Sequence, residues 1–320
     1  FHLTTMTTPF AFVFPGQGSQ SLNMMAGFAG HPQVKATFDE ASTLLGLDLW
    51  QLAGSGPEAA LNQTVNTQPL MLAAGVAAYR VWQALGGAAP AVVAGHSLGE
   101  YSALVAAGAL AFSDAVALVR FRAEAMQDAV AEGEGAMAAI LGLDGAPLFE
   151  ACSEAAQGQV LAPVNFNSPG QVVIAGNRAA VERGIAACTA RGAKRAILLP
   201  VSVPSHCALM QPAAERLRQR LADVAINVPA IPVLHNADVA SYADAAQIRD
   251  ALVRQLYSPV RWVETVQAIA ARGIAQIGEC GPGKVLAGLG KRITTDARTV
   301  ALVDSAALAQ FKTDLEGTAA

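Results

Sequence analysis

Residues 95–99, Gly-His-Ser-Leu-Gly, have the composition and spacing of a nucleophile elbow. In such a turn, small residues flank a serine between a strand and a helix, and the hydroxyl projects above the sheet at the helix N-terminus. The apolar run 91–94 precedes the pentapeptide, and good helix formers follow it. We therefore predict that Ser97 is a nucleophile and that the backbone N–H of Leu98 lies where an oxyanion would develop.

A serine nucleophile needs a general base, and histidine is the commonest one. The chain contains five histidines, His2, His31, His96, His206 and His235. His96 adjoins the serine, where supporting the turn suits it better than proton transfer. His206 lies in a polar Val-Pro-Ser-His loop in the second half of the chain, and we predict that it is the base. On sequence alone, His235 is about equally well placed.

No acidic residue occupies the position that an α/β-hydrolase would use. Such enzymes place an acid after a strand of the main sheet, between the serine and the histidine in chain order. The acids considered in that interval are Asp114, Asp128 and Asp144, and none follows a clear strand of the main sheet. This pattern argues against an ordinary esterase, and it predicts that a group other than a carboxylate orients His206.

The composition indicates a globular protein with a large core. Of the 320 residues, 53% are hydrophobic and only 14% are charged, which suits one large domain or two moderate ones. The longest apolar stretches, such as 70–79, are too short to span a bilayer, so we expect no membrane segment. Residues 1–5 resemble a cloning remnant and lack the pattern of a signal peptide, so we expect a cytoplasmic protein.

Charge and cysteine content narrow the possible partners. The net charge is −4, and no cluster of Lys and Arg is interleaved with aromatic residues, so nucleic acid is excluded as an expected partner. The four cysteines, Cys152, Cys188, Cys207 and Cys280, are scattered without a Cys-x-x-Cys spacing. We expect reduced thiols, with neither a disulfide framework nor a metal site.

The elements around the elbow predict a parallel sheet flanked by helices. Strands are expected at 10–14 and 91–94, with a helix over 68–85 between them and another helix after the serine. A further helix is expected from Ser113, whose hydroxyl would cap it, to about residue 130. Later apolar runs at 232–234 and 274–277 should complete the sheet.

The middle of the chain has a different order of elements. Strand, helix, strand, strand, helix and strand are expected at 136–142, 145–157, 160–165, 171–176, 178–191 and 195–199. This βαββαβ order is that of a ferredoxin-like unit. We therefore predict a small subdomain over 131–202, inserted into a large α/β domain formed by 6–130 and 203–320.

Five motifs along nearly the whole chain resemble those of malonyl-coenzyme A:acyl carrier protein transacylases. They are Pro-Gly-Gln-Gly-Ser-Gln at 15–20, Gly-His-Ser-Leu-Gly-Glu-Tyr-Ser at 95–102, Asn-Ser-Pro-Gly-Gln at 167–171, Val-Pro-Ser-His at 203–206 and Gly-Pro-Gly-Lys at 281–284. The resemblance implies an α/β-hydrolase-like domain with a parallel sheet and an inserted ferredoxin-like subdomain. It also implies malonyl transfer from coenzyme A to the phosphopantetheine thiol of acyl carrier protein, through an ester on the serine.

The resemblance assigns roles to individual residues. Ser97 would be the nucleophile, His206 the base, the carbonyl of Gln255 the group that orients His206, and the N–H groups of Gln17 and Leu98 the oxyanion hole. Arg122 would bind the free malonyl carboxylate, which suits the planar guanidinium fork. His96, Asn165 and Asn167 would line the acyl site. Coenzyme A enters as a substrate, so no cofactor or metal is expected.

The carrier protein implied by the resemblance is acidic, and its docking would need a local basic patch. Lys194–Arg195 and Lys291–Arg292 are the candidate pairs, although each is equally consistent with solvated surface. We expect a monomer that serves fatty acid synthesis. The alternatives are a serine hydrolase or thioesterase of the same fold type and an acyltransferase of a polyketide pathway.

Two glycine-rich loops raise the possibility of nucleotide binding. Residues 278–284 follow an expected strand and nearly match a phosphate-binding loop, but Val285 stands where Ser or Thr must bind magnesium. The Gly-Gln-Gly at 16–18 lacks the third glycine of a dinucleotide fingerprint. Neither loop outweighs the elbow.

Overall fold

A computed structural model describes residues 6–317 of the chain. The expected remnant at 1–5, with His2, lies outside the described residues. The larger part is built on a five-stranded sheet in the order β7-β2-β1-β8-β9, in which every neighbouring pair is parallel. Its strands are β1 Phe10–Phe14, β2 Val92–Gly95, β7 Val233–Leu234, β8 Gln276–Cys280 and β9 Arg298–Leu302. The prediction of a parallel α/β sheet is confirmed.

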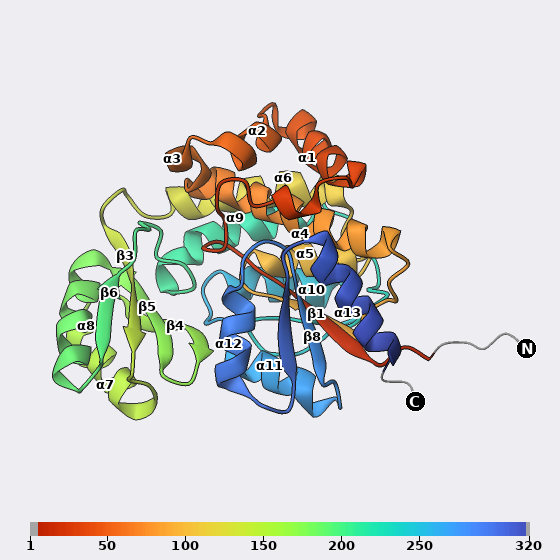
Figure 1. The fold of residues 1–320 in the computed structure, drawn as a ribbon. Coiled ribbons are helices and arrows are strands. Elements are labelled where there is room, and N and C mark those ends of the chain that lie inside the picture. The colour runs from red at the N-terminus through yellow and green to blue at the C-terminus, as the bar shows by residue number, and fades with distance from the viewer. Residues whose placement is uncertain (1–5, 318–320) are drawn as a thin grey trace, which may run out of the picture.

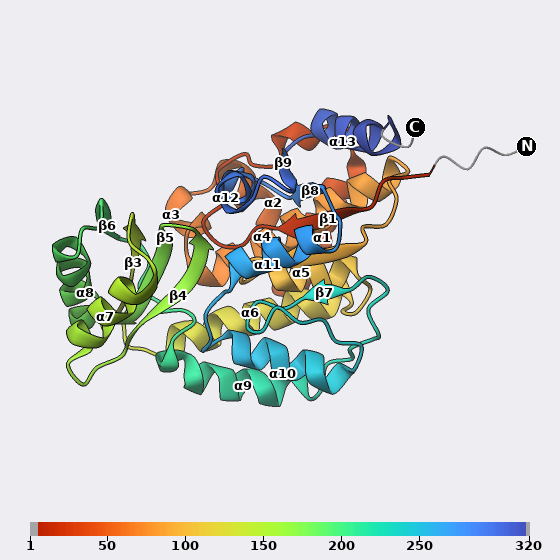
Figure 2. The same cartoon turned by 90° about the horizontal axis from the view of Figure 1, so that it is seen from below.

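Helices cover both faces of this sheet (Figures 1 and 2). Those before the small subdomain are α1 Pro32–Leu45, α2 Leu49–Ser55, α3 Glu58–Leu61, α4 Thr64–Ala84, α5 Gly99–Ala106 and α6 Phe112–Asp128, with a 3₁₀ turn at Ala26–Phe28. Those after it are α9 Gln211–Leu221, α10 Ala245–Gln255, α11 Trp262–Ala271, α12 Val285–Ile293 and α13 Ser305–Gly317, with a 3₁₀ turn at Ala208–Met210. Within 6–317, no helix is both long and apolar enough to cross a membrane.

Strand β1 lies in the middle of the sheet and is buried along its whole length. Phe10, Phe12 and Phe14 point into the core that contains α4 and α13, and the first two pack edge to face against Trp82. The small residues between them face the opposite layer, which contains α11 and α12. Because helices cover both faces of a central parallel strand, the strand has an apolar side chain at every position.

The start of α6 differs from the sequence prediction. The helix begins at Phe112, its N-cap residue is Ala111, and no side chain caps it. The prediction that the Ser113 hydroxyl caps this helix is therefore wrong. Phe112 is buried and belongs to the helix, which places Ser113 one residue inside the first turn. Asp114 does lie in the first turn, as expected from the helix dipole.

The small subdomain has the predicted βαββαβ order. Its elements are β3 Gly135–Leu141, α7 Gly145–Ala156, β4 Leu161–Ser168, β5 Gln171–Asn177, α8 Arg178–Ala190 and β6 Arg195–Leu198. The strands form a separate antiparallel sheet in the order β4-β5-β3-β6, with both helices packed on it. The exact boundaries at 130/131 and 202/203 stay a prediction.

Strand β4 joins the two parts of the molecule. The amide of Val260, just before α11, donates to the Val164 carbonyl at 2.8 Å, and the Phe166 amide donates to the Val260 carbonyl at 3.0 Å. Strand β6 forms the opposite edge of the small sheet, and Figure 1 shows it on the outer side of this lobe. The small sheet is therefore fixed to the large domain beside the carboxyl end of the parallel sheet.

Candidate active site

The predicted elbow connects β2 to α5 with very close backbone packing. A Cβ atom on Gly95 would lie 1.9 Å from the Gly99 carbonyl carbon, and one on Gly99 would lie 2.1 Å from the Phe14 carbonyl oxygen. Neither position can hold a side chain without moving the backbone. Between them, Ser97 has a φ of +52°, a left-handed conformation that is unfavourable for residues other than glycine. The strained turn places the serine at the start of α5.

Ser97 and His206 are in direct contact. The Nε2 atom of His206 lies 2.9 Å from the Ser97 Oγ, and its Nδ1 atom lies 2.7 Å from the Gln255 carbonyl oxygen. A carbonyl oxygen can only accept, so Nδ1 carries the proton and Nε2 is free to accept one from the serine. The position of an acid in a hydrolase is thus taken by a backbone carbonyl at the end of α10.

The two candidate bases have different surroundings. His235 is fully buried beside Glu100, with its Nδ1 atom 3.3 Å from a carboxylate oxygen of that residue. It makes no contact with Ser97, whose hydroxyl faces His206 instead. His31 lies just before α1, where its Nε2 is 2.7 Å from the Ser305 Oγ. Of the two histidines left open by the sequence, His206 is therefore the one in contact with the serine, and its role as base stays a proposal.

Burial strongly affects the basicity of His206. Its side chain is 3% exposed, and burial followed by the positive charge of Arg122 lowers its pKa from 6.5 to about 3. The imidazole is therefore neutral at physiological pH, as a general base must be. The same shift means that the unfolded chain takes up a proton below about pH 6.5 while the folded chain does not, so this group lowers stability as pH falls from there towards 3.

We predict that the acylation step depends little on pH. Single-turnover kcat/KM for malonyl-CoA should stay within about twofold between roughly pH 5 and 8, because His206 remains neutral throughout. A base that kept the ordinary pKa would be about thirtyfold less active at pH 5. Circular dichroism at each pH would control for unfolding, and a decline in kcat/KM with an apparent pKa near 6.5 in folded protein would contradict the prediction.

Arg122 lies in the same buried site. It is 1% exposed, and its guanidinium donates to Oε1 of Gln68 at 2.8 Å, to Oε1 of Gln255 at 2.8 Å and to the Ser97 Oγ at 3.3 Å. Burial lowers the pKa of Arg122, but arginine stays charged in proteins. All three acceptors are neutral oxygens, so the cation is held beside the nucleophile without a hydrogen-bonded anion. Such a site favours a substrate group with a negative charge.

The loop at 15–20 lies against the elbow. A Cβ atom on Gly16 would be 2.4 Å from the His96 carbonyl oxygen and 3.5 Å from the Leu98 amide nitrogen. Within residues 6–317, the backbone amides of Gln17 and Leu98 have no hydrogen-bond partner in the protein. The Gln17 side chain turns outward to Thr64 Oγ1 at 3.3 Å. Two free N–H groups beside the nucleophile suit an oxyanion hole, and that role stays a proposal.

His96 and Asn167 join the elbow to the small subdomain. The His96 Nε2 lies 2.8 Å from the Asn167 Oδ1, and the ring lies 5.4 Å from that of Trp262. Burial lowers the pKa of His96. Asn165 contributes backbone pairing with Val260, and its Oδ1 is buried with no partner in the described chain. These contacts indicate that His96 positions the turn, and they leave the acyl-lining role of the two asparagines a proposal.

The two basic pairs proposed for docking are exposed but lie apart. Lys194 and Arg195 are at the start of β6, on the edge of the small sheet that faces away from the large domain. Lys291 and Arg292 are in the last turn of α12, a helix that neighbours β4. The structure does not bring the four residues together, so they form two separate surfaces.

The glycine-rich loop at 281–284 packs against the loop of Gln17. A Cβ atom on Gly281 would lie 3.0 Å from the Pro15 ring, and one on Gly283 would lie 3.2 Å from the Ser19 Cβ. Both glycines also have positive φ angles, +138° and +84°. The glycines therefore permit close packing behind the proposed oxyanion hole, which explains the near match to a phosphate-binding loop.

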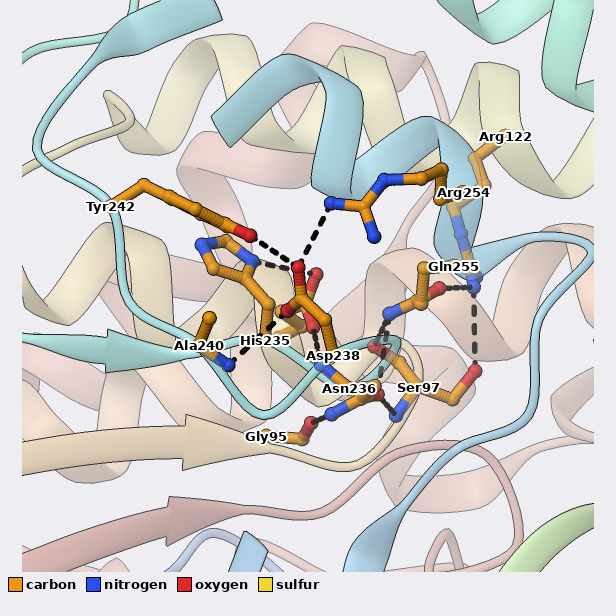
Figure 3. Close-up of polar contacts among 11 residues, drawn as sticks. Gly95, Ser97, Arg122, His235, Asn236, Asp238, Ala240, Tyr242, Arg254 and Gln255 are labelled. Carbon is orange, nitrogen blue, oxygen red and sulfur yellow. Dashed lines mark hydrogen bonds and ion pairs between the residues drawn. The ribbon is translucent and has the colours of Figure 1, made fainter. Parts of the chain in front are cut away.

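Sequence reasoning missed several buried polar residues at the site. Gln68 accepts a hydrogen bond from Arg122. Asn236, two residues after β7, bonds to the elbow backbone (Figure 3). Glu100, in the first turn of α5, bonds in turn to the Asn236 amide at 2.6 Å. A polar His-Asn pair directly after the strand predicted at 232–234 was the available signal, because the ends of parallel strands meet at one edge of the sheet.

The fold and this geometry define a serine enzyme of the acyl-transfer class: an elbow serine, a neutral histidine and a buried arginine at the carboxyl edge of a parallel sheet. The family model for the acyl transferase domain matches residues 11–309. The malonyl CoA-acyl carrier protein transacylase of Escherichia coli K12 is 59% identical over 94% of this chain and 98% of its own length. The corresponding enzyme of Bacillus subtilis is 44% identical over 92% of this chain and 93% of its own length.

Solved structures agree with these relatives. The malonyl CoA-acyl carrier protein transacylase of Coxiella burnetii superposes with a TM-score of 0.96 at 51% identity, over 97% of this chain and 99% of that one. A malonyl-transacylase solved in complex with a type II PKS acyl-carrier protein gives 0.95 at 56% identity, over 96% of this chain and 100% of that one. The chain belongs to the malonyl CoA-acyl carrier protein transacylase family.

Proposed function

We propose that this chain transfers the malonyl group of malonyl-CoA to the phosphopantetheine thiol of acyl carrier protein, through an ester on Ser97. The observation that carries the proposal is the contact of one hydroxyl with two groups. The Ser97 Oγ lies 2.9 Å from the neutral His206 Nε2 and 3.3 Å from the guanidinium of Arg122. A nucleophile is thus held next to its base and next to a buried cation that suits a carboxylate.

The first half-reaction forms the malonyl ester. Ser97 Oγ attacks the thioester carbonyl while its proton passes to His206 Nε2, and the oxyanion accepts from the amides of Gln17 and Leu98. The intermediate collapses with cleavage of the carbon–sulfur bond, and the imidazolium returns the proton to the sulfur of coenzyme A. The Gln255 carbonyl stabilises the transient charge through Nδ1–H.

The second half-reaction reverses these steps with a new thiol. His206 takes the proton of the carrier protein's phosphopantetheine thiol, and the sulfur attacks the ester carbonyl of malonyl-Ser97. The carbon–oxygen bond breaks and Ser97 recovers its proton. Because both half-reactions use one serine and one histidine, the kinetics should be ping-pong.

Arg122 provides the selectivity for malonyl. The free carboxylate of the substrate can accept two hydrogen bonds from the planar guanidinium, and it replaces the weaker contact with the serine hydroxyl. That exchange also frees the Ser97 Oγ to attack. A substrate without the carboxylate, such as acetyl-CoA, would leave a buried charge unpaired, which disfavours its binding.

The experiment that tests the function measures where the malonyl group goes. Purified protein with malonyl-CoA should hydrolyse the thioester slowly, and addition of holo acyl carrier protein should produce malonyl carrier protein at a much higher rate. Mass spectrometry of the carrier protein would follow the transfer directly. Hydrolysis of malonyl-CoA at the same rate with and without carrier protein, with no malonyl carrier protein formed, would instead identify a hydrolase or thioesterase.

We propose fatty acid synthesis as the pathway that uses the product. A polyketide pathway is the second candidate, because one similar enzyme was solved with a type II PKS acyl-carrier protein. Transfer to carrier proteins of both kinds, measured side by side, would separate the two. We also propose that the protein is a monomer, and analytical ultracentrifugation would test it.

Charge reversal should locate the docking surface for the carrier protein. We predict that Lys291→Glu with Arg292→Glu raises the carrier-protein KM several-fold at low salt and weakens its salt dependence, because α12 neighbours β4 at the junction of the two parts. The same reversal at Lys194 and Arg195 is the comparison. Each pair is exposed, so folding should be unaffected. An unaltered KM and salt dependence would remove that pair from docking.

A further inference from the structure

Asn236 is a fully buried side chain that spans the nucleophile elbow. Its Oδ1 accepts from the backbone amide of Ser97 at 2.8 Å, and its Nδ2 donates to the Gly95 carbonyl at 2.7 Å. Figure 3 shows the amide lying between these two backbone groups. One side chain therefore bonds to the backbone of both Gly95 and Ser97, although it lies 139 residues after the serine in the sequence.

The side chain of Gln255 bonds to the carbonyl of Ser97. Its Nε2 donates to the Ser97 carbonyl at 2.9 Å and approaches the Asn236 Oδ1 at 3.3 Å. Both backbone polar groups of the serine are thus bonded to buried side-chain amides. A serine with a φ of +52° needs such external constraints, because an unrestrained residue would relax to a more favourable backbone region.

Glu100 and its neighbours fix Asn236 in turn. The Glu100 carboxylate accepts from the Asn236 backbone amide at 2.6 Å, and its second oxygen lies 3.3 Å from the His235 Nδ1. Further along the loop, Asp238 accepts from the Tyr242 hydroxyl and from Arg254. Arg254 precedes Gln255 on α10, so the loop after β7 is tied to the helix whose end orients His206 (Figure 3).

We propose that Asn236 is a positioning residue for acyl transfer, held in place by Glu100. It fixes the backbone of Ser97 in the left-handed conformation, which aims the hydroxyl at His206. It also occupies the Ser97 amide, which leaves the amides of Gln17 and Leu98, both without a partner within residues 6–317, to bind the oxyanion. This inference rests on the proposed function, since it assigns Asn236 a role only if Ser97 carries the acyl group.

Asn236→Ala should slow acylation without weakening binding. In single-turnover reactions with malonyl-CoA, we expect the maximal acylation rate to fall about 100-fold, because small displacements of a nucleophile have effects of that size. The half-saturating malonyl-CoA concentration should change little, since Arg122 keeps its contacts with Gln68 and Gln255. The ionised side chain of Asn236→Asp keeps an acceptor for the serine amide but has no donor for the Gly95 carbonyl, and this variant should lose about tenfold.

A destabilised control separates positioning from general loss of structure. Leu308 is buried in α13, which packs on the edge strand β9, three strands from β2. Leu308→Ala should therefore lower the melting temperature while leaving the acylation rate at the wild-type value. The inference is overturned if Asn236→Ala acylates at the wild-type rate, or if it changes only the half-saturating malonyl-CoA concentration. It is also overturned if Leu308→Ala lowers the maximal acylation rate as much as Asn236→Ala does. If Asn236→Ala does not fold, the isosteric variant Asn236→Asp provides the test, and a wild-type acylation rate in that variant would overturn the inference.

Ser97→Ala in the same assay distinguishes failure of the proposed function from failure of the positioning role of Asn236. If that variant still transfers malonyl, the proposed function itself fails. If Ser97→Ala is inactive and the folded Asn236 variants acylate normally, the proposed function stands and only the positioning role of Asn236 is lost.

Discussion

Replacing Ser97 with alanine will lower malonyl transfer at least roughly 10⁴-fold, because the variant has no atom that can form the acyl ester. His206 and the free amides remain, but without a nucleophile they can only promote direct attack of the carrier-protein thiol on malonyl-CoA. Initial rates of malonyl carrier protein formation, followed by mass spectrometry, would measure the loss.

The same variant should remain folded and should still bind substrate. Alanine at this position carries the same left-handed strain as serine, and Arg122 keeps its contacts with Gln68 and Gln255. Calorimetric titration with malonyl-CoA and thermal unfolding provide the controls. Transfer above about one hundredth of the wild-type rate by folded protein would show that another group accepts the malonyl.

Arg122→Ala will invert the preference between malonyl and acetyl donors. We expect kcat/KM for malonyl-CoA to fall about 10³-fold, because removing one partner of a buried charge pair costs roughly 2–5 kcal/mol. The acetyl group has no carboxylate that could bind to Arg122, so kcat/KM for acetyl-CoA should be unchanged or higher. Competition between the two donors, read out on the carrier protein, gives the selectivity ratio directly.

Arg120 offers a matched control on the same helix. It lies two residues away and is partly exposed, and it bonds to Glu124 and to the Val65 carbonyl instead of to the site residues. Arg120→Ala should leave the malonyl-to-acetyl ratio at the wild-type value. A ratio that Arg122→Ala does not change, or that both variants change equally, would remove Arg122 from the carboxylate site.

Much of the fold could be predicted from local patterns. The strand 10–14 is apolar at every position because helices bury both of its faces, and the βαββαβ order of the small subdomain follows from alternating periodicities within 136–199. The elbow was equally visible, since Gly95 and Gly99 are required by backbone approaches shorter than any side chain allows. Such features depend on neighbours that are close in sequence.

The rest of the site depends on contacts between distant segments. Whether His206 or His235 contacts Ser97 depends on which loop reaches the elbow, and the sequence contains no local signal for that. Arg122 has the sequence setting of a solvated helix residue, yet packing of α4, α6 and α10 buries it completely. Asn236 was not predicted, although its place directly after the strand at 232–234 puts it at the edge of the sheet where parallel strands end.

The malonyl–enzyme ester is the central claim, and trapping it is the most direct test. Protein mixed briefly with malonyl-CoA in the absence of carrier protein should be quenched under denaturing conditions, digested and mapped by mass spectrometry. We predict one malonyl group, located on the peptide that contains Ser97 and removed when holo acyl carrier protein is added before the quench. A malonyl adduct on any other peptide, or a Ser97 adduct that carrier protein does not discharge, would contradict the proposal.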